Sequence, residues 1–383
     1  MPNFFYIAAI ASTLLLLGGC RWDSASRSRS PENLAQNLAQ NLAQNLALPS
    51  ILSSDAAMTD SQTLAQSDAE LSFDQAADFS EGLAMVRRGD RLLFIDLTGN
   101  VAIAVDPNMD GAADFSEDLA LVKANGVYGY MNRAGEVIVP PQYLGAASFS
   151  GGLAAIRAGT RYGYINPAGE VAIEPQFDLA GSFAEGLAAV KLGDRYGFIA
   201  PTGKLVIDPQ FEDAWRLSQG RAAVRQGGRW GYIDTTGALV IDPQFDGAFR
   251  FADGRARVRQ GGDWGFIDLQ GNLAIAPQFG FASDFAEGRA AVLVGAKWGY
   301  VDCQGQMAIA PQFDYAADFS EGLAAVKQGN RYGYINPTGT WVIAPQFDDA
   351  AAFSEGWARV KLGNQWRYVN RQGQFLKASP LLR

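Results

Sequence analysis

The segment Gly159-Thr160-Arg161-Tyr162-Gly163-Tyr164-Ile165-Asn166 returns, with small changes, along most of this chain. Its aromatic-glycine step recurs every 34 residues, at Tyr128-Gly129, Tyr162-Gly163, Tyr196-Gly197, Trp230-Gly231, Trp264-Gly265, Trp298-Gly299 and Tyr332-Gly333. A fixed period of this length is the signature of a repeat architecture, in which equivalent units pack against one another. The sequence therefore predicts an array of like modules.

Two further columns keep the same period, which indicates that whole structural units repeat. One is an apolar column made of Phe115, Phe149, Phe183, Leu217, Phe251, Phe285, Phe319 and Phe353. The other is a Pro-Gln-Phe segment that starts at Pro175, Pro209, Pro243, Pro277, Pro311 and Pro345. The end units differ, because Leu93 and Arg367 stand where the glycine is expected. Atypical ends are typical of arrays whose terminal units have only one neighbour.

Each unit is expected to fold as a three-stranded β-meander followed by a connector. In one unit the expected strands are residues 153–157, 161–166 and 171–173, and the expected turns are 159–160 and 167–170. Pro175 ends the third strand because it has no N–H to donate. Alternation places Gly163 on the strand face opposite Tyr162 and Tyr164. We expect this glycine to let a neighbouring backbone or ring come close.

A single unit is too small to stand alone, because it encloses little apolar surface. Stacking would bury rings such as Phe177 and Phe183 between neighbouring units, and each ring would contribute about 2 to 3 kcal/mol. We therefore predict an all-β domain over residues 71–383. It is expected to contain about nine three-stranded repeats in an open superhelical or solenoid-like array.

A closed β-propeller is the alternative arrangement. Propeller blades usually have four strands and about 40 residues, and the atypical end units favour an open array. One feature favours closure, because Leu71-Ser72-Phe73-Asp74 matches the Pro-Gln-Phe-Asp segment that the last unit lacks. In that arrangement the N-terminal end of the domain would complete the final repeat.

Composition argues against several function classes. With a formal net charge of -9 and a pI near 4.7, the chain lacks the broad basic surface that a nucleic-acid partner requires. It contains no histidine, which is the commonest metal ligand and the commonest general base at neutral pH. No phosphate-binding glycine loop lies between a strand and a helix. We therefore expect no cofactor, no metal and no nucleic-acid partner.

The remaining catalytic candidates are carboxylates and one cysteine. The carboxylates that follow Pro-Gln-Phe recur in equivalent positions, as residues of a structural turn would, at Asp178, Asp246, Asp314 and Asp348. Cys303 occurs in one unit only, and without a histidine it lacks the usual activating base. The sequence thus predicts no catalytic residue and no enzyme.

Residues 1–20 are predicted to be a lipoprotein signal peptide. Phe4 to Leu17 is nearly continuous apolar sequence, short for a spanning helix and suited to a secretory signal. Its end, Leu17-Gly18-Gly19-Cys20, resembles the lipobox of bacterial lipoproteins, although no Lys or Arg precedes the apolar run. The resemblance implies that Cys20 carries acyl chains that hold the protein at a membrane. An uncleaved anchor and a plain signal peptide are the alternatives.

Residues 21–70 are predicted to be a low-complexity linker, because Ser, Ala, Asn and Gln dominate and aromatic residues are few. An Asn-Leu-Ala-Gln tract within it places leucines four residues apart, at Leu34, Leu38, Leu42 and Leu46. These leucines would form a stripe on an amphipathic helix. Asparagine at every fourth position disfavours a helix, so a spacer is the preferred interpretation.

The linked columns resemble the WG-repeat family. The resemblance rests on Phe-x-Glu-Gly-Leu-Ala-x-Val, on aromatic-Gly-aromatic-Ile, and on Pro-Gln-Phe-Asp, with Trp-Gly itself at Trp230, Trp264 and Trp298. It covers roughly residues 71 to 380 in about nine units. The family has no catalytic residues to transfer. The resemblance implies repeat-mediated interaction, commonly in bacterial envelope proteins, without a defined chemistry.

Two basic columns and the aromatic column are the candidate ligand surface. Its members are Arg157, Arg161, Lys191, Arg195, Arg225, Arg229, Trp230, Trp264, Trp298, Lys327 and Arg331. Adjacent basic residues would form ladders that an acidic polysaccharide or a partner protein can follow. We favour instead their neutralisation by an acidic column made of Glu185, Asp253, Glu287, Glu321 and Glu355. The rings would form a stacking platform for sugars or a peptide, or, as we favour, fill the seams between units.

The leading functional prediction is a non-catalytic, lipid-anchored binding or scaffold protein of the bacterial cell envelope, in the periplasm or facing the cell surface. Its repetitive β surface would bind a protein or an envelope polysaccharide. An enzyme that acts on envelope polysaccharide through a carboxylate pair is one alternative. A purely structural spacer is another.

Overall fold

The computed structural model describes residues 70–377, all of which belong to one compact unit. These residues form β-strands joined by turns and bends, and they include no helix. Within this range there is accordingly no apolar helix of membrane-spanning length. The predicted signal peptide, Cys20 and the predicted linker up to residue 69 lie outside the described residues.

The strands form nine sheets, which we call blades 1 to 9 in chain order. Blades 1 to 3 contain β1 (Gln75–Ala76), β2 (Leu83–Arg88), β3 (Arg91–Asp96), β4 (Val101–Ala104), β5 (Gly111–Ser116), β6 (Leu119–Ala124), β7 (Val127–Asn132), β8 (Val137–Tyr143), β9 (Gly145–Ala146), β10 (Ala154–Ala158), β11 (Arg161–Ile165) and β12 (Val171–Phe177). Blades 4 to 6 contain β13 (Leu179–Ala180), β14 (Ala188–Leu192), β15 (Arg195–Ile199), β16 (Leu205–Phe211), β17 (Asp213–Ala214), β18 (Ala222–Gln226), β19 (Arg229–Ile233), β20 (Leu239–Phe245), β21 (Gly247–Ala252), β22 (Arg255–Gln260), β23 (Asp263–Ile267) and β24 (Leu273–Phe279). Blades 7 to 9 contain β25 (Phe281–Ala282), β26 (Arg289–Val294), β27 (Lys297–Asp302), β28 (Met307–Phe313), β29 (Tyr315–Ala316), β30 (Ala324–Gln328), β31 (Arg331–Ile335), β32 (Trp341–Phe347), β33 (Asp349–Ala350), β34 (Trp357–Leu362) and β35 (Gln365–Asn370).

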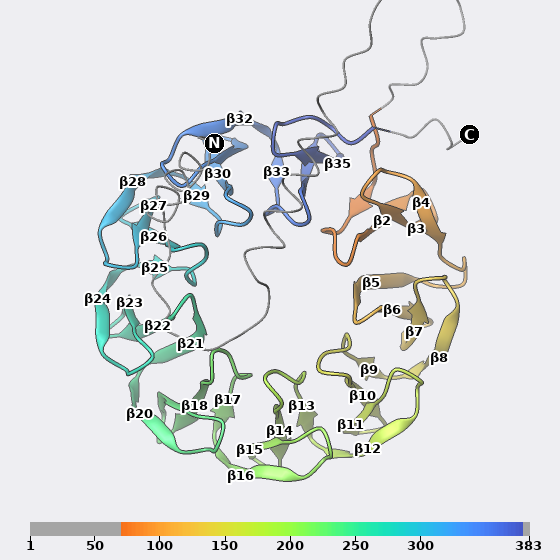
Figure 1. Ribbon diagram of the computed structural model, residues 1–383, viewed down its shortest axis with the longest axis vertical. Helices are drawn as coiled ribbons and strands as arrows, with labels where there is room; N and C mark the ends of the chain where they lie inside the picture. Colours follow the sequence, from red (N-terminus) through yellow and green to blue (C-terminus); the bar gives the residue numbers. More distant parts are fainter. Residues whose placement is uncertain (1–69, 378–383) are drawn as a thin grey trace, which may run out of the picture. The chain divides into compact units, whose positions relative to one another are not determined.

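Consecutive strands of each blade pair antiparallel, and the first strand of each blade is the inner one. The inner strand has two residues in seven blades and six residues in blades 2 and 6, and the outer strand has seven residues in blades 2 to 8. Figure 1 shows the described blades arranged as a ring, with outer strands such as β16 and β24 on the periphery and short strands such as β13 nearer the centre. The prediction of an all-β fold with nine repeats is confirmed. The expectation of three strands per unit is wrong for eight of the blades, because the connector supplies a fourth, inner strand.

In the blades that have an aromatic-glycine step, the outer strand bulges toward the glycine of that step. In blade 5, Trp230 pairs with Phe245 and Tyr232 pairs with Ile241, so the outer strand has extra residues between the two pairs. A Cβ atom on Gly231 would lie 2.5 Å from the carbonyl oxygen of Ile241. The predicted close approach of a backbone to this glycine is confirmed, and that backbone is the outer strand of the same blade.

Successive blades are joined by recurring contacts. The Tyr164 ring of blade 3 lies 5.0 Å from the Phe183 ring of blade 4, and its hydroxyl donates a 2.8 Å hydrogen bond to the carbonyl of Gly181. The Ser150 hydroxyl donates to the carbonyl of Phe183 at 2.7 Å. The Glu117 carboxylate of blade 2 accepts two backbone N–H bonds from blade 3. The buried Phe183 ring thus lies between units, as predicted.

The same contacts join blade 9 to blade 1. The Tyr368 hydroxyl donates to the carbonyl of Ala77 at 2.6 Å. The Glu355 carboxylate accepts the backbone N–H of Gly82 at 2.8 Å. Because the last blade meets the first as any blade meets the next, no blade keeps a free face. The predicted open array is therefore wrong, and the closed nine-bladed β-propeller, named above as the alternative, is the fold.

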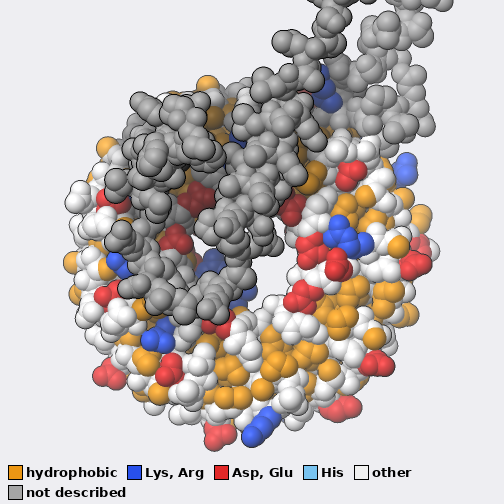
Figure 2. Space-filling model, in the orientation of Figure 1, with side chains coloured by type: hydrophobic (Ala, Val, Ile, Leu, Met, Phe, Trp, Pro, Cys, Tyr) orange, Lys and Arg blue, Asp and Glu red, His pale blue; other side chains and the backbone are white. Residues whose placement is uncertain are grey.

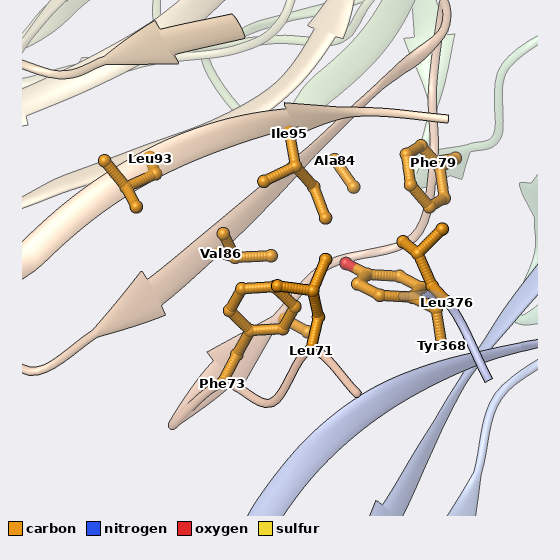
Figure 3. Packing of buried hydrophobic residues seen from close by; sticks show 10 residues of the cluster. Leu71, Phe73, Phe79, Ala84, Val86, Leu93, Ile95, Tyr368 and Leu376 are labelled. Carbon is orange, nitrogen blue, oxygen red and sulfur yellow. The ribbon is translucent and has the colours of Figure 1, made fainter. Parts of the chain in front are cut away.

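Both ends of the described chain build the outer edge of blade 9. Phe73 exchanges backbone hydrogen bonds with Trp366, at 2.9 and 2.7 Å. The Leu71 N–H donates a 3.1 Å hydrogen bond to the carbonyl of Leu376. This bond joins the first residues of the described chain to the last ones. Figure 3 shows Leu71, Phe73 and Leu376 packed around Tyr368. The N-terminal copy of the Pro-Gln-Phe-Asp segment therefore completes the last repeat.

The two units without the glycine are the two without a continuous bulged outer strand. In blade 1, Leu93 pairs directly with Ala104. In blade 9, the Arg367 guanidinium forms an ion pair with Glu70 and lies 5.4 Å from the ring of Phe375, so it contacts both ends of the described segment. A side chain fits at both positions because no bulge presses on the site that glycine fills elsewhere.

Candidate functional site

The first basic column and the aromatic column lie side by side in a row near the hairpin turn of each blade. In blade 4, Lys191 pairs with Leu179 on the inner strand and with Tyr196 on the next strand. Its ammonium nitrogen lies 5.5 Å from the centre of the Tyr196 ring. Lys327 repeats this arrangement in blade 8, and Arg157 occupies the equivalent, half-buried place in blade 3. The two lysines therefore sit against rings of their own blades.

The second basic column is neutralised, but by carboxylates other than those predicted. Ion pairs join Arg161 to Asp178, Arg229 to Asp246, Lys297 to Asp314, and Arg331 to Asp348. Arg195 lies 3.9 Å from Glu212, and Arg225, which belongs to the first basic column, lies 3.8 Å from the same carboxylate. These side chains are well exposed, so each pair adds little stability. Glu185, a predicted partner, instead accepts two backbone N–H bonds from the next blade, so that prediction is wrong.

The carboxylates that follow Pro-Gln-Phe hold turns, as predicted. Asp178 accepts the backbone N–H of Gly193 at 2.7 Å. The same bond recurs in the pairs Asp74 and Gly89, Asp246 and Gly261, Asp314 and Gly329, and Asp348 and Gly363. Cys303 is half-buried, and its sulfur lies 3.1 Å from the side-chain nitrogen of Gln304.

Four rings in blades 5 to 8 break the repeat. Trp215 and Phe249 stand where the other blades have alanine, glycine or serine. Phe281 and Tyr315 stand where the other blades have Gln75, Gly111, Gly145, Leu179, Asp213, Gly247 and Asp349. Trp215, Phe281 and Tyr315 expose 45%, 41% and 42% of their surfaces. Since seven equivalent positions support the same fold without a ring, packing does not require these rings.

These rings join part of the aromatic column in one continuous row, which we call the aromatic arc. It consists of Trp215, Phe249, Trp264, Phe281, Trp298, Tyr315 and Tyr332, with successive ring centres 5.6 to 6.1 Å apart. Trp264 and Trp298 are half-buried, because they also pack against the cores between blades. They therefore fill a seam, as favoured from sequence, and also belong to a surface row. Trp230 packs at the core between blades 5 and 6, outside the arc.

Arg257 holds the middle of the arc. Its guanidinium carbon lies 3.7 Å from the centre of the Phe249 ring and 5.6 Å from those of Trp264 and Phe281. The same group pairs with Asp284 at 2.8 Å, and both side chains are only 15% exposed. A shielded cation against aromatic faces contributes about 2 kcal/mol. Arg257 therefore fixes three rings of the arc in place.

A groove of about 660 Å³ lies at the blade 5 end of the arc, and we call it the arc groove. Its lining consists of Leu179, Ala180, Gly181, Ser182, Ala189, Tyr196, Ala214, Trp215, Arg216, Phe249, Arg250 and Asp284. Arg250 lies 3.2 Å from Asp284. Arg216 is exposed, and no carboxylate of residues 70–377 lies within ion-pair distance of it. The arc groove therefore combines aromatic rings with one unpaired guanidinium.

Two equivalent sets of one arginine and two aspartates bridge successive blades. One set is Arg257, Asp284 and Asp318, and the other is Arg359, Asp78 and Asp114. Burial raises the pKa of Asp318, and the nearby Asp284 carboxylate adds to the increase. Burial likewise raises the pKa of Asp114, with Asp78 adding to it. Figure 2 shows acidic and basic side chains around the central opening of the ring.

Asp114 should make stability depend on pH. Because its pKa is raised on folding, the folded protein holds this proton to higher pH than the unfolded chain, and stability is lost as pH rises through the folded pKa. Asp114→Ser copies Ser148 and Ser182, which fill the equivalent position in blades 3 and 4. We expect this variant to have a higher free energy of unfolding than the wild type at neutral pH. The difference should shrink below about pH 4, where the carboxyl is protonated in both states.

Urea unfolding of the wild type and of Asp114→Ser at the two pH values measures this effect. Asp90→Asn is a suitable control, because Asp90 is exposed and, among the described residues, its carboxylate forms no hydrogen bond or ion pair. A stability difference for Asp114→Ser that does not change with pH would contradict the assignment.

The recurring columns of the sequence do not include Trp215, Phe249, Phe281, Tyr315 or Arg257. Each of these residues stands where most other units have a different and smaller side chain. The sequence signal that marks them is departure from the repeat, whereas the predicted surface was built from residues that recur. Of the predicted ligand-surface residues, only Trp264 and Trp298 lie in the arc.

Comparison with solved structures found the following similarities. Among solved structures, the crystal structure of the eukaryotic initiation factor is 9% identical, with 78% of this chain and 97% of that chain covered and a TM-score of 0.57. The WD40 domain of SCAP from fission yeast is 10% identical, with coverage of 80% and 96% and a TM-score of 0.40. BamB from Moraxella catarrhalis is 14% identical, with coverage of 62% and 81% and a TM-score of 0.37. At 9% identity, the likeness to the initiation factor concerns the fold alone.

No curated protein matched the chain in sequence. The family model described as WG containing repeat matches nine segments, at residues 69–91, 94–128, 128–159, 162–196, 196–230, 230–262, 264–298, 298–332 and 332–366. These segments follow the same period as the blades. The chain therefore belongs to the family of proteins built from WG containing repeats.

Proposed function

We propose that this protein is a non-catalytic, lipid-anchored scaffold of the bacterial cell envelope that binds a protein or glycan partner through the aromatic arc. A propeller of WG repeats suggests a binding or scaffold role. The observation that carries the proposal is the exposure of Trp215, Phe281 and Tyr315, at positions where the same fold accepts small residues. Large exposed rings gathered in one row are typical of interaction sites.

Binding through the arc is tested with a triple variant of the full chain, Trp215→Ala, Phe281→Gly and Tyr315→Gly. Each new residue type occupies the same position in another blade, so the fold should be kept. We expect the wild type to capture a partner from envelope extracts and the triple variant to lose it. Single substitutions should weaken capture in steps, whereas one catalytic site would be lost through one residue.

The matched control removes three exposed apolar side chains elsewhere, with Val206→Ala, Val240→Ala and Val342→Ala. These valines lie on outer strands and are 45%, 37% and 45% exposed, and Ala172, Ala274 and Ala308 fill the same position in other blades. This control should capture the partner as the wild type does. Equal capture by the triple arc variant would remove the arc from the proposal.

Anchoring is supported by the sequence before residue 70, where Leu17-Gly18-Gly19-Cys20 resembles a lipobox. Several acyl chains on one residue hold a protein at a membrane, since each buried methylene contributes about 0.8 kcal/mol. Labelled palmitate should enter the wild type and should not enter Cys20→Ser. Equal labelling of both proteins would refute the anchor and leave the binding role in place.

A further inference from the structure

The arc groove sets an exposed ring beside small neighbours. Trp215 exposes 45% of its surface, and Tyr196 and Phe249 line the same groove. The rest of the lining is rich in small residues, namely Ala180, Gly181, Ser182, Ala189 and Ala214. Such side chains leave room beside the indole for a flat ligand ring with apolar C–H groups.

The arc groove is basic in a protein whose formal net charge is -9. Arg216 and Arg250 occupy a position that in the other blades holds Asp78, Asp114, Ser148, Ser182, Asp284, Asp318 and Ala352. Asp284 is already paired with Arg250 and Arg257, at 3.2 and 2.8 Å. The Arg216 guanidinium is left for a ligand, and its forked N–H donors match the geometry of a carboxylate.

We propose that the arc groove binds an acidic oligosaccharide that carries uronic-acid carboxylates. This proposal rests on the binding function proposed above. A sugar ring stacks on Trp215, and its carboxylate pairs with the Arg216 guanidinium. Ser182 and Arg250 line the same groove and supply hydrogen-bonding groups for the sugar hydroxyls.

The dimensions of the arc groove favour an oligosaccharide over a peptide. Its volume, about 660 Å³, falls within the range of small-ligand sites. A stable protein interface buries about 800 Å² on each partner, which needs a broader surface. The strands β13 and β17, which border the groove, are two residues long each, and the third bordering strand, β21, is interrupted by a register shift between Ala248 and Phe251. These three strands offer too little regular edge for an extended peptide to add as a further strand.

The test uses the full chain and short oligogalacturonides, with their methyl esters as the matched neutral probe. Isothermal titration calorimetry should detect binding of the acid, and binding of the ester should be weaker by about tenfold or more, because the charge-assisted hydrogen bonds are lost. Arg216→Ser and Trp215→Ala should each weaken binding of the acid by a similar factor. Serine and alanine fill these positions in other blades, so unfolding midpoints should stay close to that of the wild type.

Lys204→Gln is the matched control, because it removes one exposed positive charge outside the groove and copies Gln306 of blade 7. It should bind the acid as the wild type does. Equal affinity for acid and ester, or unchanged affinity in Arg216→Ser, would overturn the proposal. Tighter binding of poly-glutamate than of the oligogalacturonide at this groove would make the occupant a peptide and overturn it as well.

The two proposals fail separately. If oligogalacturonides do not bind while capture from envelope extracts still depends on the arc, only the glycan assignment is lost. If neither probe binding nor capture depends on the arc, the proposed function is lost with it.

Discussion

Phe73→Ala is expected to lower the free energy of unfolding by about 3 to 5 kcal/mol, the cost of removing a fully enclosed phenylalanine ring. Phe73 lies near the start of the described chain, yet it is only 2% exposed. It packs with Tyr368 and exchanges backbone hydrogen bonds with Trp366, near the other end of the chain. Its ring is therefore part of the closure, and urea unfolding of the full chain measures its contribution.

Phe211→Ala is the matched comparison, because Phe211 occupies the same position in a blade far from the closure. It too is 2% exposed, and it pairs with Tyr196 as Phe73 does with Trp366. The two variants should lose similar amounts of stability. A nearly neutral Phe73→Ala beside a strongly destabilised Phe211→Ala would mean that the ring is open in solution, with Phe73 at a free end.

Gly231→Ala is expected to lower the free energy of unfolding by about 3 kcal/mol, at the upper end of the usual cost of overpacking. The new Cβ would lie 2.5 Å from the carbonyl oxygen of Ile241 and 2.7 Å from the backbone nitrogen of Pro243. Both atoms belong to the bulged backbone of the outer strand, which cannot yield as a flexible side chain does. Chemical denaturation followed by tryptophan fluorescence measures the loss.

Gly111→Ala is the control for this substitution. Gly111 is also a strand glycine without a positive φ, and a Cβ placed on it meets no heavy atom within 4 Å. Alanine there should leave stability unchanged or raise it by up to about 1 kcal/mol, because it reduces the freedom of the unfolded chain. If Gly231→Ala were tolerated as well as Gly111→Ala, the outer strand would not press on this glycine.

Much of the repeat unit could be predicted from the sequence, because the forces that shape it are local and recur every 34 residues. Strand-forming runs, turn glycines and the close approach at Gly163 were predicted and are observed. The inner strand was not predicted, because it is only two residues long in most blades and is defined by pairing with its neighbour. So short a segment has no periodicity of its own.

In the aromatic arc, too, the residues that recur with the period were predicted and the others were not. Trp264 and Trp298 recur with the period and were therefore predicted as surface candidates. Trp215 and Phe281 belong to different blades and lie far apart along the chain. Only the folded ring places them in one row, on either side of Phe249 and Trp264.

By itself, the sequence determined the repeat, its number, its β-strands and the glycine that each unit requires. It also contained the segment Leu71–Asp74, which could end an open array or complete a closed one. Only the tertiary structure decided between the two. Closure depends on the angle between one blade and the next. That angle follows from how rings such as Tyr164 and Phe183 pack between blades. Because packing between units is a property of the assembled chain, a period alone cannot specify it.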